Sequence, residues 1–343
     1  MARPPIGSAG QAGRRRPERR VTVIPTASPA DFRVTLDVVR GCLLGLALGD
    51  ALGAPHEGGL LERLVWRVVG RTRLGERRWT DDTQMTLDVV ESLLARGAVH
   101  QDDLARRFAR SQHWSRGYGP GAARVLGRIR RGDSWEHASR SVYPEGSFGN
   151  GAAMRAPILG VVYACDAESL DDAVTRSAVI THAHPLAIEG ALIVARATAA
   201  AAMGLAMREH IEHAADGAAL APYRARLRIA ADWLSQNTSV PIATVRDQLG
   251  NGIAAVDSCV TALYLAVSRL DSPFMTLHEA AVALGGDVDT ISAMAGAIWG
   301  ARHGGAALPA EPLASLEDRD RLERLASDLA RIDWSRSGDG PRR

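Results

Sequence analysis

Two short segments of this sequence place paired aspartates beside a threonine. The first is Gly285-Gly286-Asp287-Val288-Asp289-Thr290, and an apolar run begins directly after it. Glycine adopts the positive φ angles of tight turns, and an acid is stabilised at a helix N-terminus, so capping would explain one aspartate. Two carboxylates and a hydroxyl together are the oxygen ligands that a hard divalent cation prefers. Taken alone, this segment fits a helix cap and a metal site equally well.

The second segment, Trp79-Thr80-Asp81-Asp82-Thr83, stands before a run in which apolar residues recur every four positions from 85 to 94. That spacing predicts a helix with one apolar face, and Thr80 is a suitable N-cap residue with acids in the first turn. The two helix starts together offer four carboxylates and two hydroxyls, enough oxygen for two divalent ions that share acids. The alternative is that both are only capped helix starts.

Four segments together resemble one known family. An early Gly-Asp and Glu segment contains Asp50 and Glu57, and Thr-Asp-Asp-Thr stands at 80–83. Gly-Asn-Gly with Met-Arg occupies 149–155, and Gly-Gly-Asp-x-Asp-Thr occupies 285–290. Their types and order are similar to those of the ADP-ribosylglycohydrolase family, also called the dinitrogenase-reductase-activating glycohydrolase family.

The resemblance implies an all-α, single-domain orthogonal helical bundle that binds two Mg²⁺ ions, with Mn²⁺ as an alternative. The implied metal ligands are Thr80, Asp81, Asp82, Asp287, Asp289 and Thr290.

Two further acids precede these segments. Glu57 lies in a loop of glycine and proline, where functional residues often collect; the resemblance assigns it to catalysis, whereas the residue alone would be read as a solvated charge. Asp50 is expected near the end of a buried helix, where an unpaired charge is costly. We expect Asp50 to support the metal ligands by hydrogen bonds, with helix capping as the rival interpretation.

Glycine-rich segments are candidates for contacting a phosphate through backbone N–H groups. They match neither a P-loop nor a dinucleotide-binding fingerprint. The resemblance implies that 117–119 adjoin a diphosphate and that His182 faces a ribose. Phe148, at a position where relatives carry tyrosine, could stack on a ribose or adenine face, with an ordinary core phenylalanine as the alternative. Arg155 is predicted to form a buried ion pair. The predicted substrate-binding residues are Gly117, Tyr118, Gly119, Gly146, Ser147, Phe148, Gly149, Asn150, Gly151 and His182.

The elements that must position these residues are expected to be helices, because no convincing alternating strand pattern occurs. The expected helices, besides those after Thr80 and Thr290, cover 32–52, 101–113, 120–131, 156–164, 168–180, 186–203, 221–237, 241–250, 253–269, 275–284 and 317–331.

Composition limits the remaining possibilities. The 343 residues carry a formal net charge of only +2, which predicts no extended basic face for nucleic acid. No run of eighteen apolar residues occurs, so no membrane span is expected. Three isolated cysteines suggest reduced thiols in a cytoplasm. We expect a monomer with a disordered basic tail at 1–30, one domain at 31–333 and a polar tail at 334–343.

The expected function is Mg²⁺-dependent hydrolysis of the bond between C1″ of ADP-ribose and a protein side chain. The stretch Trp114–Gly132 contains no acid, whereas arginine-directed relatives use an additional aspartate there. The resemblance therefore favours the serine-specific branch, acting on O-linked ADP-ribose on serine or in polymer, over an arginine-directed enzyme. The expected partner is an ADP-ribosylated protein or ADP-ribose. Two alternatives are an ADP-ribose-binding module without turnover and a metallohydrolase that cleaves a phosphate ester or anhydride.

Overall fold

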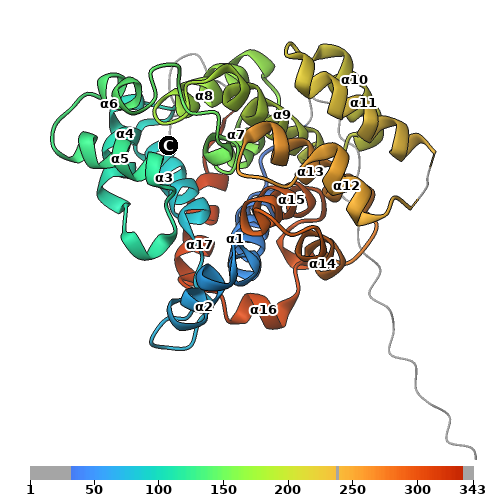
Figure 1. Cartoon of the computed structure of the whole chain (residues 1–343), viewed down its shortest axis with the longest axis horizontal. Coiled ribbons are helices and arrows are strands. Elements are labelled where there is room, and N and C mark those ends of the chain that lie inside the picture. The colour runs from blue at the N-terminus through green and yellow to red at the C-terminus, as the bar shows by residue number, and fades with distance from the viewer. Residues whose placement is uncertain (1–31, 237–238, 335–343) are drawn as a thin grey trace, which may run out of the picture.

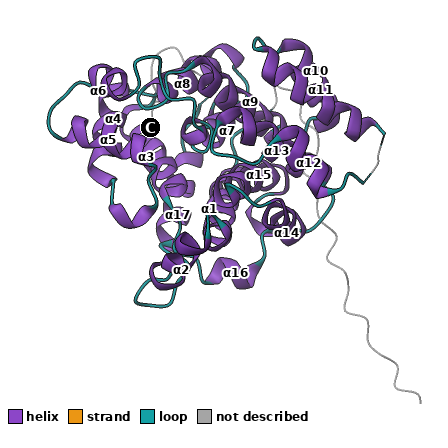
Figure 2. Cartoon of the chain, viewed as in Figure 1, coloured by secondary structure: helices purple, strands orange, loops and turns teal. Residues whose placement is uncertain are grey.

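The structure is a computed structural model that describes residues 32–236 and 239–334. Within these residues the chain forms helices α1 to α17 and four short 3-10 turns. Figure 2 shows helices joined by loops, and the only strand-like features of the described chain are three isolated bridges. The prediction of an all-α orthogonal bundle is confirmed. The predicted tail at 1–30 lies outside the described residues, as does the tail predicted at 334–343 except for Trp334.

The helices have the following bounds. The first half of the chain contains α1 Leu36–Gly53, α2 Leu60–Val69, α3 Asp81–Arg96, α4 Gln101–Ser111, α5 Pro120–Arg130, α6 Trp135–Val142, α7 Pro157–Val162 and α8 Ala167–Val179. The second half contains α9 Pro185–Ala202, α10 Met207–Gly217, α11 Ala221–Ser235, α12 Ile242–Leu249, α13 Ala255–Ser268, α14 Phe274–Leu284, α15 Val288–His303, α16 Ala310–Ala314 and α17 Arg319–Ala330.

Helices α1 and α15 form the centre of the molecule (Figure 1). Glycines of α1 touch the backbone of α15 at regular intervals: Gly41 faces Gly300, Gly45 faces Gly296, and Gly53 faces Asp289. An added Cβ at any of these glycines would overlap the opposite backbone, so small residues are required for this approach. As the residue numbers rise along α1, those of the facing residues fall along α15, and the two helices are therefore antiparallel.

A second buried helix, α9, packs against α7, α8, α13 and α15. It is long and apolar enough to cross a membrane by length and composition, but 67% of that stretch is buried inside the structure. A core helix passes the same test, so α9 does not indicate a membrane span.

The remaining helices surround this centre. Figure 1 shows α4, α5 and α6 on one side and α10, α11 and α12 on the other. Helix α17 packs against α1 and α3. The indole of Trp334 is buried and donates a hydrogen bond to the Leu329 carbonyl. The fold therefore includes Trp334, which the sequence had assigned to the polar tail.

Candidate active site

The antiparallel pairing of α1 and α15 brings the end of one helix to the start of the other. Gly53 lies against the backbone of Asp289, so the loop after α1 meets the first turn of α15. Gly285 and Gly286 both adopt positive φ, at 69° and 78°, as the sequence predicts for a tight turn. Asp287 occupies the N-cap position but makes no side-chain capping bond, which leaves its carboxylate available for another role.

Asn251 holds the turn that carries Asp287, and it was not identified from the sequence. Its carbonyl accepts a hydrogen bond of 2.9 Å from the Asp287 N–H, and its amide donates to the Leu284 carbonyl over 3.2 Å. A Cβ on Gly286 would overlap Asn251. The Gly-Asn-Gly at 250–252 was the available signal for this residue.

Asp50 connects the start of α3 to the end of α1. Its buried carboxylate accepts hydrogen bonds from the N–H of Thr80 at 2.9 Å, the N–H of Thr83 at 3.1 Å and the Thr83 hydroxyl at 2.6 Å. Thr80 caps α3 through a 3.3 Å bond from the Asp82 N–H. The expectation that Asp50 supports the neighbouring ligands through hydrogen bonds agrees with these contacts.

The two aspartate segments meet across the helix ends. Thr290 Oγ1 lies 3.5 Å from Asp82 Oδ1. Carboxylate oxygens of Glu57, Asp287 and Asp289 all lie within 4.8 Å of one another, a group that could hold a metal ion. Glu57 follows a 3-10 turn directly after α1 and therefore reaches the same cluster. Its carboxylate is grouped with two of the predicted metal ligands, so its predicted catalytic role stays a prediction.

The cluster concentrates negative charge in a buried place. Asp82, Asp287 and Asp289 are only 2–4% exposed. Burial and the neighbouring carboxylates raise the pKa values of Asp81, Asp82 and Asp289 well above the usual range. Among the described residues, no arginine or histidine forms an ion pair with these aspartates. The buried Asp82 Oδ2 has no hydrogen-bond partner. An oxygen-binding cation would satisfy this donor set, so the residues fit a divalent metal.

The Gly146–Gly151 segment lies against this cluster and against His182. Asn150 Nδ2 donates to Asp287 Oδ2 over 2.5 Å and to the Ser258 hydroxyl over 3.1 Å. Gly149 and Gly151 face the His182 ring so closely that a Cβ on Gly151 would overlap it. Phe148 is 56% exposed and meets His184 edge-on, so it is a surface side chain rather than a core phenylalanine.

His182 is buried and neutral. Burial and the positive charge of Arg155 lower its pKa to about 3. Its Nδ1 lies 2.8 Å from the Thr181 hydroxyl, which also accepts from Arg155 over 3.0 Å. A hydroxyl that accepts from Arg155 can donate to Nδ1, which leaves an N–H at Nε2. That nitrogen faces Gly149 and Gly151.

Arg155 does not form the ion pair predicted for it. The side chain is fully buried, and it donates hydrogen bonds to neutral oxygens of Gly151, Ser177 and Thr181. It also lies over the Phe108 ring at 4.9 Å. Enough neutral acceptors surround the guanidinium to satisfy it without a carboxylate, and one of them fixes the glycine segment.

The other predicted glycine loop approaches the start of α3. A Cβ on Gly117 would lie 3.8 Å from Asp81 Oδ1 and 3.9 Å from Thr80. Gly117 has φ 83°, and Gly119 is the N-cap of α5. Tyr118, between them, is partly buried against the core. The structure thus brings both glycine segments to the aspartate cluster.

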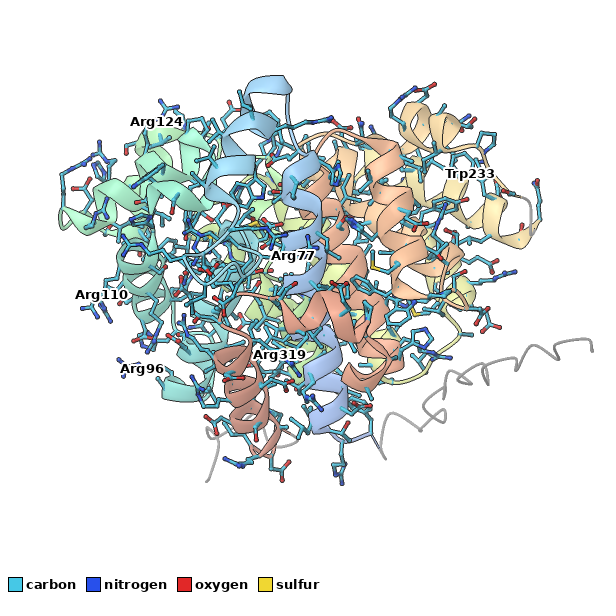
Figure 3. All side chains as sticks on the ribbon, turned by 90° about the horizontal axis from the view of Figure 1, so that it is seen from below. Arg77, Arg96, Arg110, Arg124, Trp233 and Arg319 are labelled. Carbon is cyan, nitrogen blue, oxygen red and sulfur yellow. The ribbon has the colours of Figure 1, made fainter. Side chains whose placement is uncertain are left out.

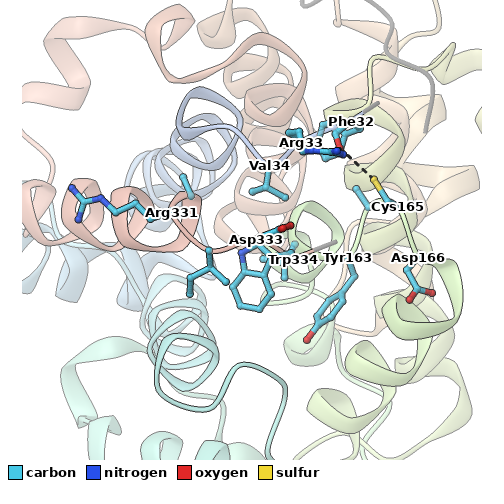
Figure 4. A pocket seen from close by; sticks show the side chains of 13 residues that line it. Phe32, Arg33, Val34, Tyr163, Cys165, Asp166, Arg331, Asp333 and Trp334 are labelled. Carbon is cyan, nitrogen blue, oxygen red and sulfur yellow. Dashed lines mark hydrogen bonds between the residues drawn. The ribbon is translucent and has the colours of Figure 1, made fainter. Parts of the chain in front are cut away.

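A separate cavity of about 570 Å³ lies away from all of these residues (Figure 4). Its lining comes from Phe32–Val34, Val162–Asp166 and Ala330–Trp334, close to both ends of the described chain. None of the predicted site residues lines it, so cavity size alone would direct attention to the wrong place.

Comparison with known proteins gives a consistent result. The sequence model of a family described as ADP-ribosylglycohydrolase matches residues 31–337. The human protein "ADP-ribosylhydrolase ARH3" is 33% identical over 87% of this chain and 94% of its own length. The mouse protein of that name is 32% identical over 85% and 91%. A solved structure described as an "ADP-ribosylglycohydrolase-related protein complex" is 29% identical, with a TM-score of 0.63 over 86% of this chain and 98% of that one.

Proposed function

Because the chain belongs to the ADP-ribosylglycohydrolase family and is a glycosidic-bond hydrolase, we propose that it hydrolyses the C1″ bond that joins ADP-ribose to a modified protein side chain. The observation that carries this proposal is the meeting of three helix ends at one buried carboxylate cluster. Two glycine segments and a neutral histidine adjoin that cluster. Such a site offers acids for proton transfer beside backbone that a large anionic ligand can approach closely.

Two Mg²⁺ or Mn²⁺ ions would be held by Thr80, Asp81, Asp82, Asp287, Asp289 and Thr290. When bound, these ions would supply positive charge that orients ribose hydroxyls and water and polarises oxygens at the reacting carbon. The unpartnered Asp82 Oδ2 supports a cation at this place. Asn150 would keep the Asp287 carboxylate in position through its amide.

Glu57 would move the proton that glycosidic cleavage requires. Loss of the leaving group gives the anomeric carbon oxocarbenium character, and a carboxylate beside the ring can serve both the leaving oxygen and the attacking water. Gly58, next to Glu57, has a φ of 68°, a conformation that favours glycine.

The rest of the ligand would lie along the glycine segments. The Asn150 N–H donates to the Ile253 carbonyl over 3.0 Å. The other backbone N–H groups of 147–151 and those of the loop before α5 would receive the diphosphate, which suits the N-terminal end of a helix. His182 is neutral, so its Nε2 would act as a hydrogen-bond donor to a ribose hydroxyl and not as a charged partner. Phe148 is exposed and could stack on an adenine or ribose face.

The linkage proposed is O-linked ADP-ribose, on serine or in polymer. The loop from Trp114 to α5 brings glycine rather than another acid beside Asp81. Cleavage at oxygen releases a neutral alcohol after one proton is delivered, which a single carboxylate can accomplish. An arginine-directed enzyme is the second candidate, and a binding module without turnover is the third.

The decisive experiment is a panel of matched peptides carrying serine-linked or arginine-linked ADP-ribose, together with the polymer, at equal Mg²⁺. We expect faster release from the O-linked substrates, with intact ADP-ribose as the product. Faster release from arginine would reverse the linkage assignment. AMP as the product would indicate cleavage of the diphosphate, and binding without any product would indicate a reader of ADP-ribose.

A further inference from the structure

A short segment near the end of the chain is bonded to the residues that lead into α3. The Arg77 N–H donates to the Ser315 carbonyl over 2.5 Å, and the Glu317 N–H donates to the Arg77 carbonyl over 2.9 Å. The Trp79 indole donates to the Glu317 carbonyl over 3.2 Å. Figure 3 shows Arg77 near the centre of the molecule, with Arg319 below it at the start of α17. Segments more than two hundred residues apart are thereby joined beside the aspartate cluster.

Arg116 completes this junction from the glycine loop. Its guanidinium forms a forked ion pair with Glu317, with N···O distances of 2.6 and 3.1 Å. It also donates to the Trp79 carbonyl over 2.8 Å and stacks on the Trp79 ring at 3.5 Å. The Arg116 and Glu317 side chains are only 11% and 12% exposed. Arg78 Nε also lies 3.8 Å from Glu317, but the forked pair with Arg116 is the closer one, so removing either of its members would leave the other charge poorly compensated.

The chain positions of these residues give the pair a role in the site. Arg116 immediately precedes Gly117, and a Cβ added to Gly117 would lie 3.8 Å from Asp81 Oδ1. Trp79 immediately precedes Thr80, the cap of α3. We propose that Arg116, held by Glu317, is a positioning residue that sets the spacing between the Gly117–Gly119 loop and the carboxylates at the start of α3.

Asp318 supports the same interpretation. It is the one non-glycine residue with positive φ in the described part of the chain, at 50°. Such backbone strain persists where the surrounding structure requires it. Here it turns the chain between Glu317 and α17, so that the Glu317 carboxylate points to Arg116 while its backbone pairs with Arg77.

The spacing matters for a ligand that contacts both the Gly117–Gly119 loop and the carboxylates at the start of α3. That this ligand is ADP-ribose rests on the proposed function. Its diphosphate and its distal ribose are covalently linked, so the loop and the carboxylates must stand at a fixed separation to bind both. An arginine suits this task because its planar fork and its stacking cannot be reproduced by lysine.

The test compares Arg116→Lys and Glu317→Gln with Glu323→Gln. Glu323 forms an equally forked ion pair with Arg40, at 2.6 and 2.8 Å, and also ties α17 to α1, but neither residue adjoins the site. We expect the first two variants to bind ADP-ribose roughly tenfold or more weakly by calorimetry, since small misplacements are costly, and to raise KM more than they lower kcat. Glu323→Gln should change the melting temperature alone.

Manganese binding gives a second measurement that needs no nucleotide. Arg116 also donates to the Trp79 carbonyl, directly before Thr80. Mn²⁺ affinity measured by electron paramagnetic resonance should therefore fall in Arg116→Lys and Glu317→Gln and not in Glu323→Gln. Wild-type protein that binds no ADP-ribose would refute the proposed ligand, and the Mn²⁺ titration would still test the positioning role. Unchanged ADP-ribose and Mn²⁺ affinities in Arg116→Lys and Glu317→Gln would overturn the inference.

Discussion

Glu57 is the acid whose role depends most on its exact surroundings. It stands in a glycine loop after α1, and its carboxylate groups with those of Asp287 and Asp289. A carboxylate in that place can transfer a proton or help to hold a cation, and the amide of glutamine performs neither charged role. Replacing Glu57 should reduce hydrolysis alone in the first role, and both binding and hydrolysis in the second.

For proton transfer, Glu57→Gln should keep ADP-ribose binding while hydrolysis falls by roughly 10²–10⁴. Calorimetry and initial rates on the same preparation measure the two effects, with Glu136→Gln, an exposed residue of α6, as the control. Binding and hydrolysis lost together would instead identify Glu57 as a ligand of the cation.

Asp88 is a buried acid of α3 outside the cluster. It accepts hydrogen bonds from Ser111 at 2.5 Å and from Gln84 at 3.5 Å, yet burial raises its pKa to about 7. The folded protein therefore binds a proton at Asp88 more tightly than the unfolded chain does, in which an aspartate has a pKa of about 3.9. Stability contributed by this group is present below the unfolded pKa and is lost as pH rises to about 7.

Asp88→Asn should therefore melt at a higher temperature than the wild type at pH 8, with a smaller difference at pH 5. Asp103 gives the opposite control. Burial opposes its charge, but hydrogen bonds from Arg107, Ser92 and Arg96 prevail and lower its pKa to about 2. Asp103→Asn should therefore destabilise the protein at both pH values. A pH-independent effect of Asp88→Asn would show that Asp88 is charged in the folded state.

At the scale of elements, the close approach of α1 and α15 determines where the acids meet. A Cβ on Gly300 would overlap the Gly41 carbonyl, and interiors of native density do not absorb such a change freely. Gly300→Ala should lower stability by about 1–3 kcal/mol and should reduce turnover, because shifting α15 moves Asp289.

Gly127→Ala on α5 is the matched control. The nearest atom to its Cβ would be the end of the flexible Arg131 side chain at 3.7 Å. Alanine favours a helix over glycine by about 1 kcal/mol, so this variant should be neutral or slightly more stable. Thermal melts of both variants, with rates at saturating substrate, provide the comparison. Equal stability of Gly300→Ala and the wild type would mean that the two helices can separate without cost.

Helices whose apolar residues repeat regularly were predictable from the sequence, and α4, α5, α8, α9 and α13 begin and end within three residues of the expected positions. Helices α2, α6, α10 and α16 were not predicted. Val65 and Val68 of α2 are exposed, so the apolar pattern there does not mark a core face. The eight-residue α6 is too short to repeat a pattern.

The site divides in the same way. Paired acids, threonines and glycines can be recognised because their types are unusual at helix starts. Arg116 and Glu317 could not be found, because each acts through a partner that is distant in sequence or through its backbone. Asn251 was missed although its Gly-Asn-Gly segment at 250–252 marked it. Glu317 lies near the site only because residues near 317 pair with residues near 77, and no local sequence pattern encodes that contact.

At the scale of the whole molecule, the cluster joins segments near residues 50, 80 and 290 into one site. Like charges gathered in this way oppose folding unless a cation binds them, because their repulsion acts in a buried, weakly screened place. The stability of the entire fold should therefore depend on divalent ions. Any ion that binds the folded state alone stabilises it by about 2.7 kcal/mol at a hundred times its dissociation constant.

Asp287→Asn tests this dependence, because the variant should melt below the wild type in Mg²⁺ but at or above it in EDTA. In Mg²⁺ the wild type should melt several degrees above its temperature in EDTA, and the variant should lose most of that gain because an amide binds a hard cation weakly. In EDTA the variant should melt at or above the wild type, since one repelling charge near Asp289 and Glu57 is gone while Asn150 can still donate to the amide oxygen. Scans with NaCl at matched ionic strength separate ion binding from screening. A wild-type melting temperature that is the same in EDTA and Mg²⁺ would show that the cluster tolerates its charges without a cation, and the metal assignment would then be wrong.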